Sequence, residues 1–218
     1  ADGQLTIDAS SATNLTLNAS AVTNNAASIF VIGTVNADQV TLGAANDVAS
    51  LGAANDYVDA SFGGNDSINL GDGNDTVAFG SAVDISDTVR GGTHTDLLTY
   101  TDATSADGSE LNNVYDIERL VVSGDNINLT LTNTVFSETV GSGVGSDATI
   151  DASAATGFLT LNANNESTSD LLIIATGLSD FVTLGGGSDA VSLGNGADYV
   201  NAANASSDSI NLGADNDT

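Results

Sequence analysis

The chain has 218 residues, of which 29 are acidic and two are basic, giving a formal net charge of −27 at pH 7. It has no cysteine, which excludes disulfides and thiolate–metal sites, and too few basic residues to neutralise a phosphate backbone, so we predict no nucleic-acid partner. Because no run of about 18 apolar residues occurs, we also predict no membrane insertion.

The first 37 residues contain three short strand-like segments, Leu5–Ile7, Leu15–Leu17 and Ile29–Ile32. Ser, Thr, Asn and Ala separate them, as expected for turns between short strands. We predict that residues 1–37 begin a β-solenoid.

Residues 38–100 consist largely of units of nine or ten residues. A unit reads approximately as an apolar residue, Gly, any residue, Gly or Ala, Asn, Asp and a short alternating segment, most clearly in Leu70–Ala78. Small residues permit tight turns, the Asp offers carboxylate oxygens, and the alternation suits a short strand. Each unit is therefore predicted to be a turn followed by a strand. The period falters at Ser81–Ile85 and then resumes around Asp87 and Asp96.

Residues 101–148 are less regular. The polar interval 101–118 predicts a protruding loop, and strands are predicted at Leu120–Val122, Ile127–Leu131 and Val135–Val140. We expect this region to combine an irregular loop with solenoid strands.

A second copy of the repeat begins near Thr149. Residues 149–179 start it, because Thr149–Asn162 repeat Thr6–Asn18 with one insertion. Residues 180–218 then repeat 38–76 at a constant offset of 142, with 22 of 39 positions identical. We expect about one and a half copies of a tandem repeat, cut from a longer array, with one continuous solenoid throughout.

Strands this short cannot bury an apolar side alone, so the units must stack. Two units then form one coil of a flattened spiral, with parallel strands on two faces and Asp-bearing turns along both edges. This arrangement places Asp38 beside Asp56, Asp47 near Asp66, and Asp56 beside Asp75, separated by roughly the ~4.8 Å between strands. Carboxylates that close repel one another unless a cation lies between them.

The units resemble the calcium-binding nonapeptide repeat of RTX, or hemolysin-type, proteins. That resemblance implies an all-β fold, a right-handed parallel β-helix or β-roll solenoid, with several Ca²⁺ ions between successive turns. It implies that the metal ligands are the periodic aspartates Asp38, Asp47, Asp56, Asp66, Asp75, Asp87, Asp96, Asp180, Asp189, Asp198, Asp208 and Asp217. The run Leu111–Ser123 resembles, more loosely, a connector of bacterial surface-layer and adhesin-like β-strand repeat proteins.

Some turns depart from the family pattern. Ala45, Ala54 and Asp215 replace an inner glycine, and we expect those turns to bind weakly or to take another geometry, so that ions are fewer than aspartates. His94, the only histidine, is expected to be a substituted turn glycine rather than a catalytic base, and we predict that the chain is not an enzyme. A metal-free solenoid that uses Asp, Asn and Gly only for turn geometry is the open alternative.

Two functions are consistent with these features. The first is a secreted structural module that folds and rigidifies on binding calcium and assembles at a bacterial cell surface into a layer, sheath or fibre. Its partners would be further copies of itself, with cell-surface polysaccharide as a further candidate. The second is the repeat region of a secreted RTX adhesin, or the calcium-dependent tail of an exported enzyme.

Overall fold

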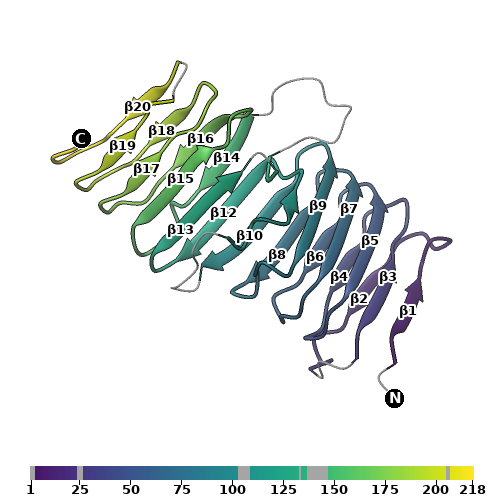
Figure 1. Cartoon of the computed structure of the whole chain (residues 1–218). Coiled ribbons are helices and arrows are strands. Elements are labelled where there is room, and N and C mark those ends of the chain that lie inside the picture. Colours follow the sequence, from purple (N-terminus) through teal and green to yellow (C-terminus); the bar gives the residue numbers. More distant parts are fainter. Residues whose placement is uncertain (1–2, 24–26, 103–108, 133, 137–146, 205–206) are drawn as a thin grey trace.

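The computed structural model describes residues 3–23, 27–102, 109–132, 134–136, 147–204 and 207–218. These residues form strands and turns only, and no helix among them is long and apolar enough to cross a membrane. The strands stack into a β-solenoid of about nine turns, with the two termini at opposite ends of the stack (Figure 1). The strands are β1 (Leu5–Asp8), β2 (Thr16–Asn18), β3 (Ile29–Ile32), β4 (Gln39–Thr41), β5 (Val48–Ala53), β6 (Tyr57–Asp59), β7 (Ser67–Asp72), β8 (Thr76–Gly80), β9 (Thr88–Thr93), β10 (Leu97–Asp102), β11 (Val114–Tyr115), β12 (Arg119–Gly124), β13 (Ile127–Thr132), β14 (Asp147–Asp151), β15 (Leu159–Asn165), β16 (Asp170–Ile174), β17 (Phe181–Thr183), β18 (Ala190–Ser192), β19 (Tyr199–Asn201) and β20 (Ser209–Asn211).

Successive strands alternate between two faces of the solenoid. The even-strand face is one sheet that runs from β2 to β20, and the odd-strand face consists of a sheet from β1 to β11 followed by a sheet from β13 to β19. Each strand pairs in parallel with the strand two positions along the chain, as β6 does with β8 and β5 with β7. One coil therefore holds two strands, as predicted from the two-unit stacking.

The core is a strip of aliphatic side chains between the two faces. On the even-strand face, one inward column is at most 3% exposed and follows the strand register through Val40, Val58, Val77, Leu98, Leu120, Ile150, Ile173 and Val191. Full burial of each such side chain contributes about 1.5–3 kcal/mol to folding. Outward positions alternate with these and are mainly polar, which is the physical origin of the alternation in the sequence.

The irregular middle region differs from its prediction. Thr134–Phe136 form a turn rather than the start of a strand, because Val135 and Phe136 bury their side chains in the core while the Val135 carbonyl accepts a hydrogen bond from Ile117 N at 2.9 Å. The rest of that predicted strand, residues 137–140, lies outside the described residues. In the predicted loop 101–118, residues 103–108 also lie outside them, whereas Leu111 and Val114 are buried rather than protruding. The other predicted strands are confirmed.

Equivalent strands of the two copies lie on opposite faces. Thr6–Asp8 belong to β1 on the odd-strand face, but their counterparts Thr149–Asp151 belong to β14 on the even-strand face. In the same way, β4 is on the even-strand face and its counterpart β17 is on the odd-strand face. The cause is the number of strands: in the part of the chain that the structure describes, thirteen strands, β1 to β13, precede the second copy, so one repeat spans six and a half coils. Each copy is rotated by half a turn relative to the copy before it.

Candidate metal centre

Eleven of the twelve predicted ligands stand directly before a strand, at the end of a turn, and Asp217 lies in the turn that follows β20. Asp75 shows the arrangement, because it precedes β8 and follows Gly73, whose φ is +153°. A Cβ on Gly73 would lie 2.1 Å from the Ala54 carbonyl oxygen and 3.0 Å from Asp75 Oδ1. The glycine therefore lets the turn rest on the coil before it and lets the carboxylate fold back over the turn.

One oxygen of each carboxylate joins neighbouring coils. Asp56 Oδ1 accepts the backbone N–H of Asp38 at 2.7 Å, and Asp75 Oδ1 accepts that of Asp56 at 2.6 Å. On the opposite edge, Asp66 Oδ1 accepts the Asp47 N–H at 2.9 Å. The predicted neighbours are thus confirmed, and the charge-assisted bonds form a ladder along each edge.

All twelve predicted aspartates belong to these two ladders. In the second copy, Asp180 N donates to Asp198 Oδ1 at 2.8 Å and Asp189 N donates to Asp208 Oδ1 at 3.1 Å. The half-turn between the copies moves equivalent aspartates to opposite edges. The edge that leads into the even-strand face carries Asp38, Asp56, Asp75, Asp96, Asp189 and Asp208, and the edge that leads into the odd-strand face carries Asp47, Asp66, Asp87, Asp180, Asp198 and Asp217.

The second oxygen of most ladder carboxylates has no such bond. Among the described residues, buried carboxylate oxygens without a hydrogen-bond donor are Oδ2 of Asp56, Asp66, Asp75, Asp96, Asp189, Asp198 and Asp208 and Oε2 of Glu166. A buried anionic oxygen without a donor is strongly destabilising. The role of Asp in the turns explains why Oδ1 accepts a backbone N–H, but it does not explain why Oδ2 is buried without a donor. These residues therefore fit a ladder that also binds cations.

Four predicted ligands have donors for both oxygens. Thr34 N donates to Asp38 Oδ2 at 2.6 Å and the Thr34 hydroxyl donates to Oδ1 at 3.0 Å, and Thr176 makes the equivalent pair of bonds to Asp180. Oδ2 of the other two, Asp47 and Asp87, accepts a backbone N–H from Gly43 or Asp84. Apart from Asp217, the predicted ligands are therefore of two kinds: these four, and the seven that have a buried Oδ2 free for a cation.

Burial also changes the acidity of the ladder. Desolvation raises the pKa of Asp56 and Asp66 to about 7 and that of Asp96 to about 8, with repulsion from neighbouring carboxylates adding to the effect. Desolvation raises the pKa of Asp189 to about 6, and the charges of Asp208 and Glu166 contribute. Burial also raises the pKa of Asp75, Asp87 and Asp180. In the absence of a cation, several of these carboxyls hold a proton close to neutral pH.

Basic side chains do not neutralise the ladders. The Arg119 guanidinium lies 4.0 Å from the carboxylate of Asp151, which belongs to neither ladder. The Arg90 guanidinium lies 4.5 Å from the centroid of the Tyr115 ring. The negative charge of the edges must therefore be balanced by protons or by added cations.

The donor set fits calcium. Among the described residues, no group of three or more His, Cys, Asp or Glu side chains is arranged to hold a metal ion by itself, so any metal would bind carboxylates together with backbone carbonyl oxygens. Ca²⁺ accepts six to eight such oxygens in irregular arrangements, whereas zinc sites use His and Cys. Carboxylate Oδ2 atoms beside tight turns are this kind of hard-oxygen set.

Sequence reasoning missed several members of the ladders. Glu118 Oε2 accepts the Asp96 N–H at 2.7 Å and so takes the place of an aspartate. Its position directly before β12, 22 residues after Asp96, was the available signal. The threonines Thr34 and Thr176, four residues before the first aspartate of each block, could also have been found from their equivalent positions in the two copies.

The substituted turns were predicted with mixed success. Ala54 and Asp215 take φ values of 72° and 95°, so these residues adopt the glycine conformation and not another geometry, while weaker calcium binding at their turns stays a prediction. Ala45 does not take a positive φ. His94 has a φ of 84° and its Nδ1 lies 3.0 Å from Thr93 Oγ1, which confirms that it replaces a turn glycine.

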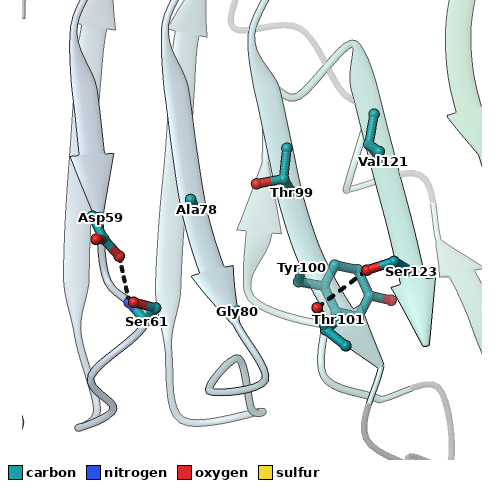
Figure 2. A pocket seen from close by; sticks show the side chains of 9 residues that line it. All are labelled: Asp59, Ser61, Ala78, Gly80, Thr99, Tyr100, Thr101, Val121 and Ser123. Carbon is teal, nitrogen blue, oxygen red and sulfur yellow. Dashed lines mark hydrogen bonds between the residues drawn. The ribbon is translucent and has the colours of Figure 1, made fainter. Parts of the chain in front are cut away.

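A shallow depression of about 310 Å³ lies on the even-strand face, apart from the ladders (Figure 2). It forms where the small residues Ala78 and Gly80 lower the surface of β8 between its neighbours. Hydroxyls surround it, including those of Thr101 and Ser123, which lie 3.1 Å apart. The depression offers polar contacts on the even-strand face.

Comparison with protein families identifies the repeats. The family model described as RTX calcium-binding nonapeptide repeat (4 copies) matches residues 32–63, 63–85 and 173–200. The matched spans contain the ladder residues from Asp38 to Asp75 and from Asp180 to Asp198. No curated protein and no solved structure matches the chain.

Proposed function

Because this chain carries RTX calcium-binding nonapeptide repeats in a β-solenoid, we propose that it is an extracellular structural module, without enzymatic activity, whose folding depends on bound Ca²⁺. The observation that carries the proposal is the row of buried, donor-free Oδ2 atoms along both edges. The formal charge of −27 adds to it, since two basic residues cannot compensate 29 acidic ones.

The ladder residues couple ion binding to folding. Asp56 and Asp75 hold consecutive coils together through Oδ1, but the same contact buries two negative charges one coil apart. Bound Ca²⁺ supplies the positive charge that such pairs lack. Since a ligand that binds only the folded state stabilises it increasingly as its concentration rises, low cytoplasmic calcium would leave the chain expanded and millimolar extracellular calcium would favour the solenoid.

Assembly into a surface layer, sheath or fibre is the second part of the proposal. Tandem copies extend one continuous stack of parallel strands, which builds length without new domains. The half-turn between copies places equivalent outer surfaces on both faces of the rod. A rod with equivalent surfaces on both faces can contact further copies of itself on either side.

Circular dichroism in the far ultraviolet tests the calcium dependence. The chain is titrated from EGTA into millimolar Ca²⁺, with Mg²⁺ at equal ionic strength as the control. We expect cooperative gain of β-structure with Ca²⁺ alone, followed by assembly visible in electron micrographs. A spectrum that is already rich in β-structure in EGTA, with a melting temperature that Ca²⁺ does not change, would refute the proposal.

An exposed aromatic pair favours a second candidate, the repeat region of an adhesin that contacts polysaccharide. Phe181 and Tyr199 are 52% and 42% exposed on the odd-strand face, with ring centroids 6.3 Å apart. Two such rings side by side suit stacking against neutral sugars. The test is titration with neutral oligosaccharides in calcium: Tyr199→Ala should abolish binding, whereas Tyr57→Ala, at the equivalent position without an aromatic neighbour, should not.

A further inference from the structure

Glu166 is a fully buried carboxylate outside the nonapeptide pattern. Its Oε1 accepts hydrogen bonds from Thr168 N at 2.9 Å, from the Thr168 hydroxyl at 3.0 Å and from Ser169 N at 2.9 Å. Its Oε2 is buried and has no donor. The residue lies before the span 173–200 that matches the family model, so neither the match nor the aspartate period accounts for it.

The carboxylate of Asp189 belongs to the next coil on the same edge. Glu166 lies in the turn before β16, and Asp189 Oδ1 accepts the N–H of Leu171, the second residue of that strand, at 3.0 Å. Gly186 N donates to the Glu166 carbonyl at 2.9 Å, so the turn before β18 rests on the turn that holds Glu166. Asp189 Oδ2 is also buried without a donor. The charge of Glu166 contributes to the raised pKa of Asp189.

Backbone carbonyls line the same contact between the turns. A Cβ on Gly186 would lie 3.1 Å from the Ser167 carbonyl oxygen, and a Cβ on Gly187 would lie 2.2 Å from that of Ser169. These glycines let the two turns approach closely, which brings carbonyl oxygens near the two carboxylates. The contact therefore collects oxygen atoms and excludes bulky side chains.

The first copy lacks this arrangement. Asp47, the counterpart of Asp189, receives a donor on Oδ2 from Gly43 N at 3.0 Å. The residue at the position of Glu166 is Val22, whose carbonyl accepts the Ala44 N–H at 3.0 Å as that of Glu166 accepts the Gly186 N–H. In the second copy Gly185 is the counterpart of Gly43, yet Asp189 Oδ2 has no donor. The acidic residue Glu166 is therefore present in the second copy, where Asp189 Oδ2 lacks the donor that Asp47 Oδ2 has in the first.

We propose that Glu166 and Asp189 bind a Ca²⁺ ion between the turns that precede β16 and β18, as an additional site before the second nonapeptide block. The inference rests on the proposed function, because it extends the calcium ladder by one coil toward the N-terminus. Calcium suits the contact better than magnesium, which demands near-octahedral geometry and retains its waters.

Counting bound ions tests the site. Equilibrium dialysis with radioactive calcium compares the whole chain with Glu166→Gln, which preserves the shape of the side chain and its Oε1 acceptor, and with Asp59→Asn, a matched loss of one charge outside the ladders. We expect Glu166→Gln to bind one ion fewer than the unmodified chain and Asp59→Asn to bind the same number. An unchanged count for Glu166→Gln, with the circular dichroism spectrum retained, would overturn the site; if the unmodified chain binds no calcium, the proposed function itself fails.

A second variant shows whether the two carboxylates share one ion. Asp189→Asn should lose the same ion, together with any ion it shares with Asp208. The double variant should therefore lose no more ions than Asp189→Asn alone. Additive losses in the double variant would mean that Glu166 and Asp189 bind separate ions, and would refute the shared site.

Discussion

The two copies of the repeat share 22 of 39 residues over their nonapeptide blocks, yet they place those residues on opposite faces and opposite edges of one solenoid. Local sequence determines that a turn is followed by a strand, and this is the same in both copies. The face on which a strand lies depends instead on how many strands precede it, and thirteen is an odd number. A surface encoded once per repeat is therefore displayed alternately on the two sides.

Most equivalent carboxylates behave alike in spite of this exchange. Asp56 and Asp198 each have a buried Oδ2 without a donor, and so do Asp66 and Asp208, whereas the threonine-capped pair Asp38 and Asp180 is satisfied in both copies. In the interior of the two blocks, the equivalent pair that differs is Asp47 and Asp189. The environment of a ladder residue is thus set by its own turn and the next coil, and not by the face it leads into.

The largest expected effect is that of pH in the absence of calcium. Folding raises the pKa of Asp56, Asp66 and Asp96 from 3.8 to about 7, 7 and 8, so the folded state binds protons more tightly than the unfolded chain. Their contribution to stability is fully present below about pH 4 and is lost as the pH rises toward 8. In EGTA we expect protonated ladders to give β-structure with a measurable melting transition at pH 5 and little or none at pH 8, and in saturating Ca²⁺ a higher melting temperature at pH 8 than at pH 5, because protons then compete with the ion.

Melting curves followed by circular dichroism at both pH values provide this measurement. Since both copies contain donor-free carboxylates, the whole transition should shift as one. A melting temperature in EGTA that is the same at pH 5 and pH 8 would contradict the assignment of buried oxygens that require a proton or a cation.

The next largest effect separates the two kinds of aspartate. Asp56→Asn and Asp198→Asn keep the Oδ1 acceptor but remove the charge, so we expect each to raise the calcium midpoint of folding by about tenfold, which corresponds to about 1.4 kcal/mol. Asp38→Asn and Asp180→Asn instead lose a hydrogen bond to threonine worth about 1 kcal/mol, with or without calcium. Calcium titrations of the four variants measure the difference, and equal midpoint shifts for all four would remove the distinction.

The smallest perturbation tests the half-turn itself, because surface substitutions leave stability nearly unchanged. The chain has no cysteine, so pairs of cysteines can be introduced for spin labels. Tyr57, Ala190 and Ser209 share one outward column of the even-strand face, six and seven coils apart, while Tyr199 lies six and a half coils from Tyr57 on the odd-strand face.

Pulsed electron–electron double resonance then compares the three distances from residue 57 in calcium. At ~4.8 Å per coil, the two pairs on one face span roughly 29 and 34 Å along the axis. The third pair spans roughly 31 Å along the axis and, because the sheets lie about 10 Å apart and the labels point outward from opposite faces, about 20 Å across it. We expect the label at 199 to be farther from 57 than either control label. A distance between the two control values would place both tyrosines on one face.

The sequence by itself determined the repeating parts of this protein: the turn-and-strand units, two units per coil, the pairing of Asp38 with Asp56, and the role of His94 as a turn residue. These follow from short-range alternation and from a period of nine or ten residues, which act within one coil and its neighbour. The tertiary structure alone decided which oxygen of each aspartate receives a donor, that Glu118 and Glu166 join the ladders, and that the second copy is rotated by half a turn. Those features depend on how many coils the irregular residues between the two blocks form. That number decides the face on which the second copy lies and which turns contact one another.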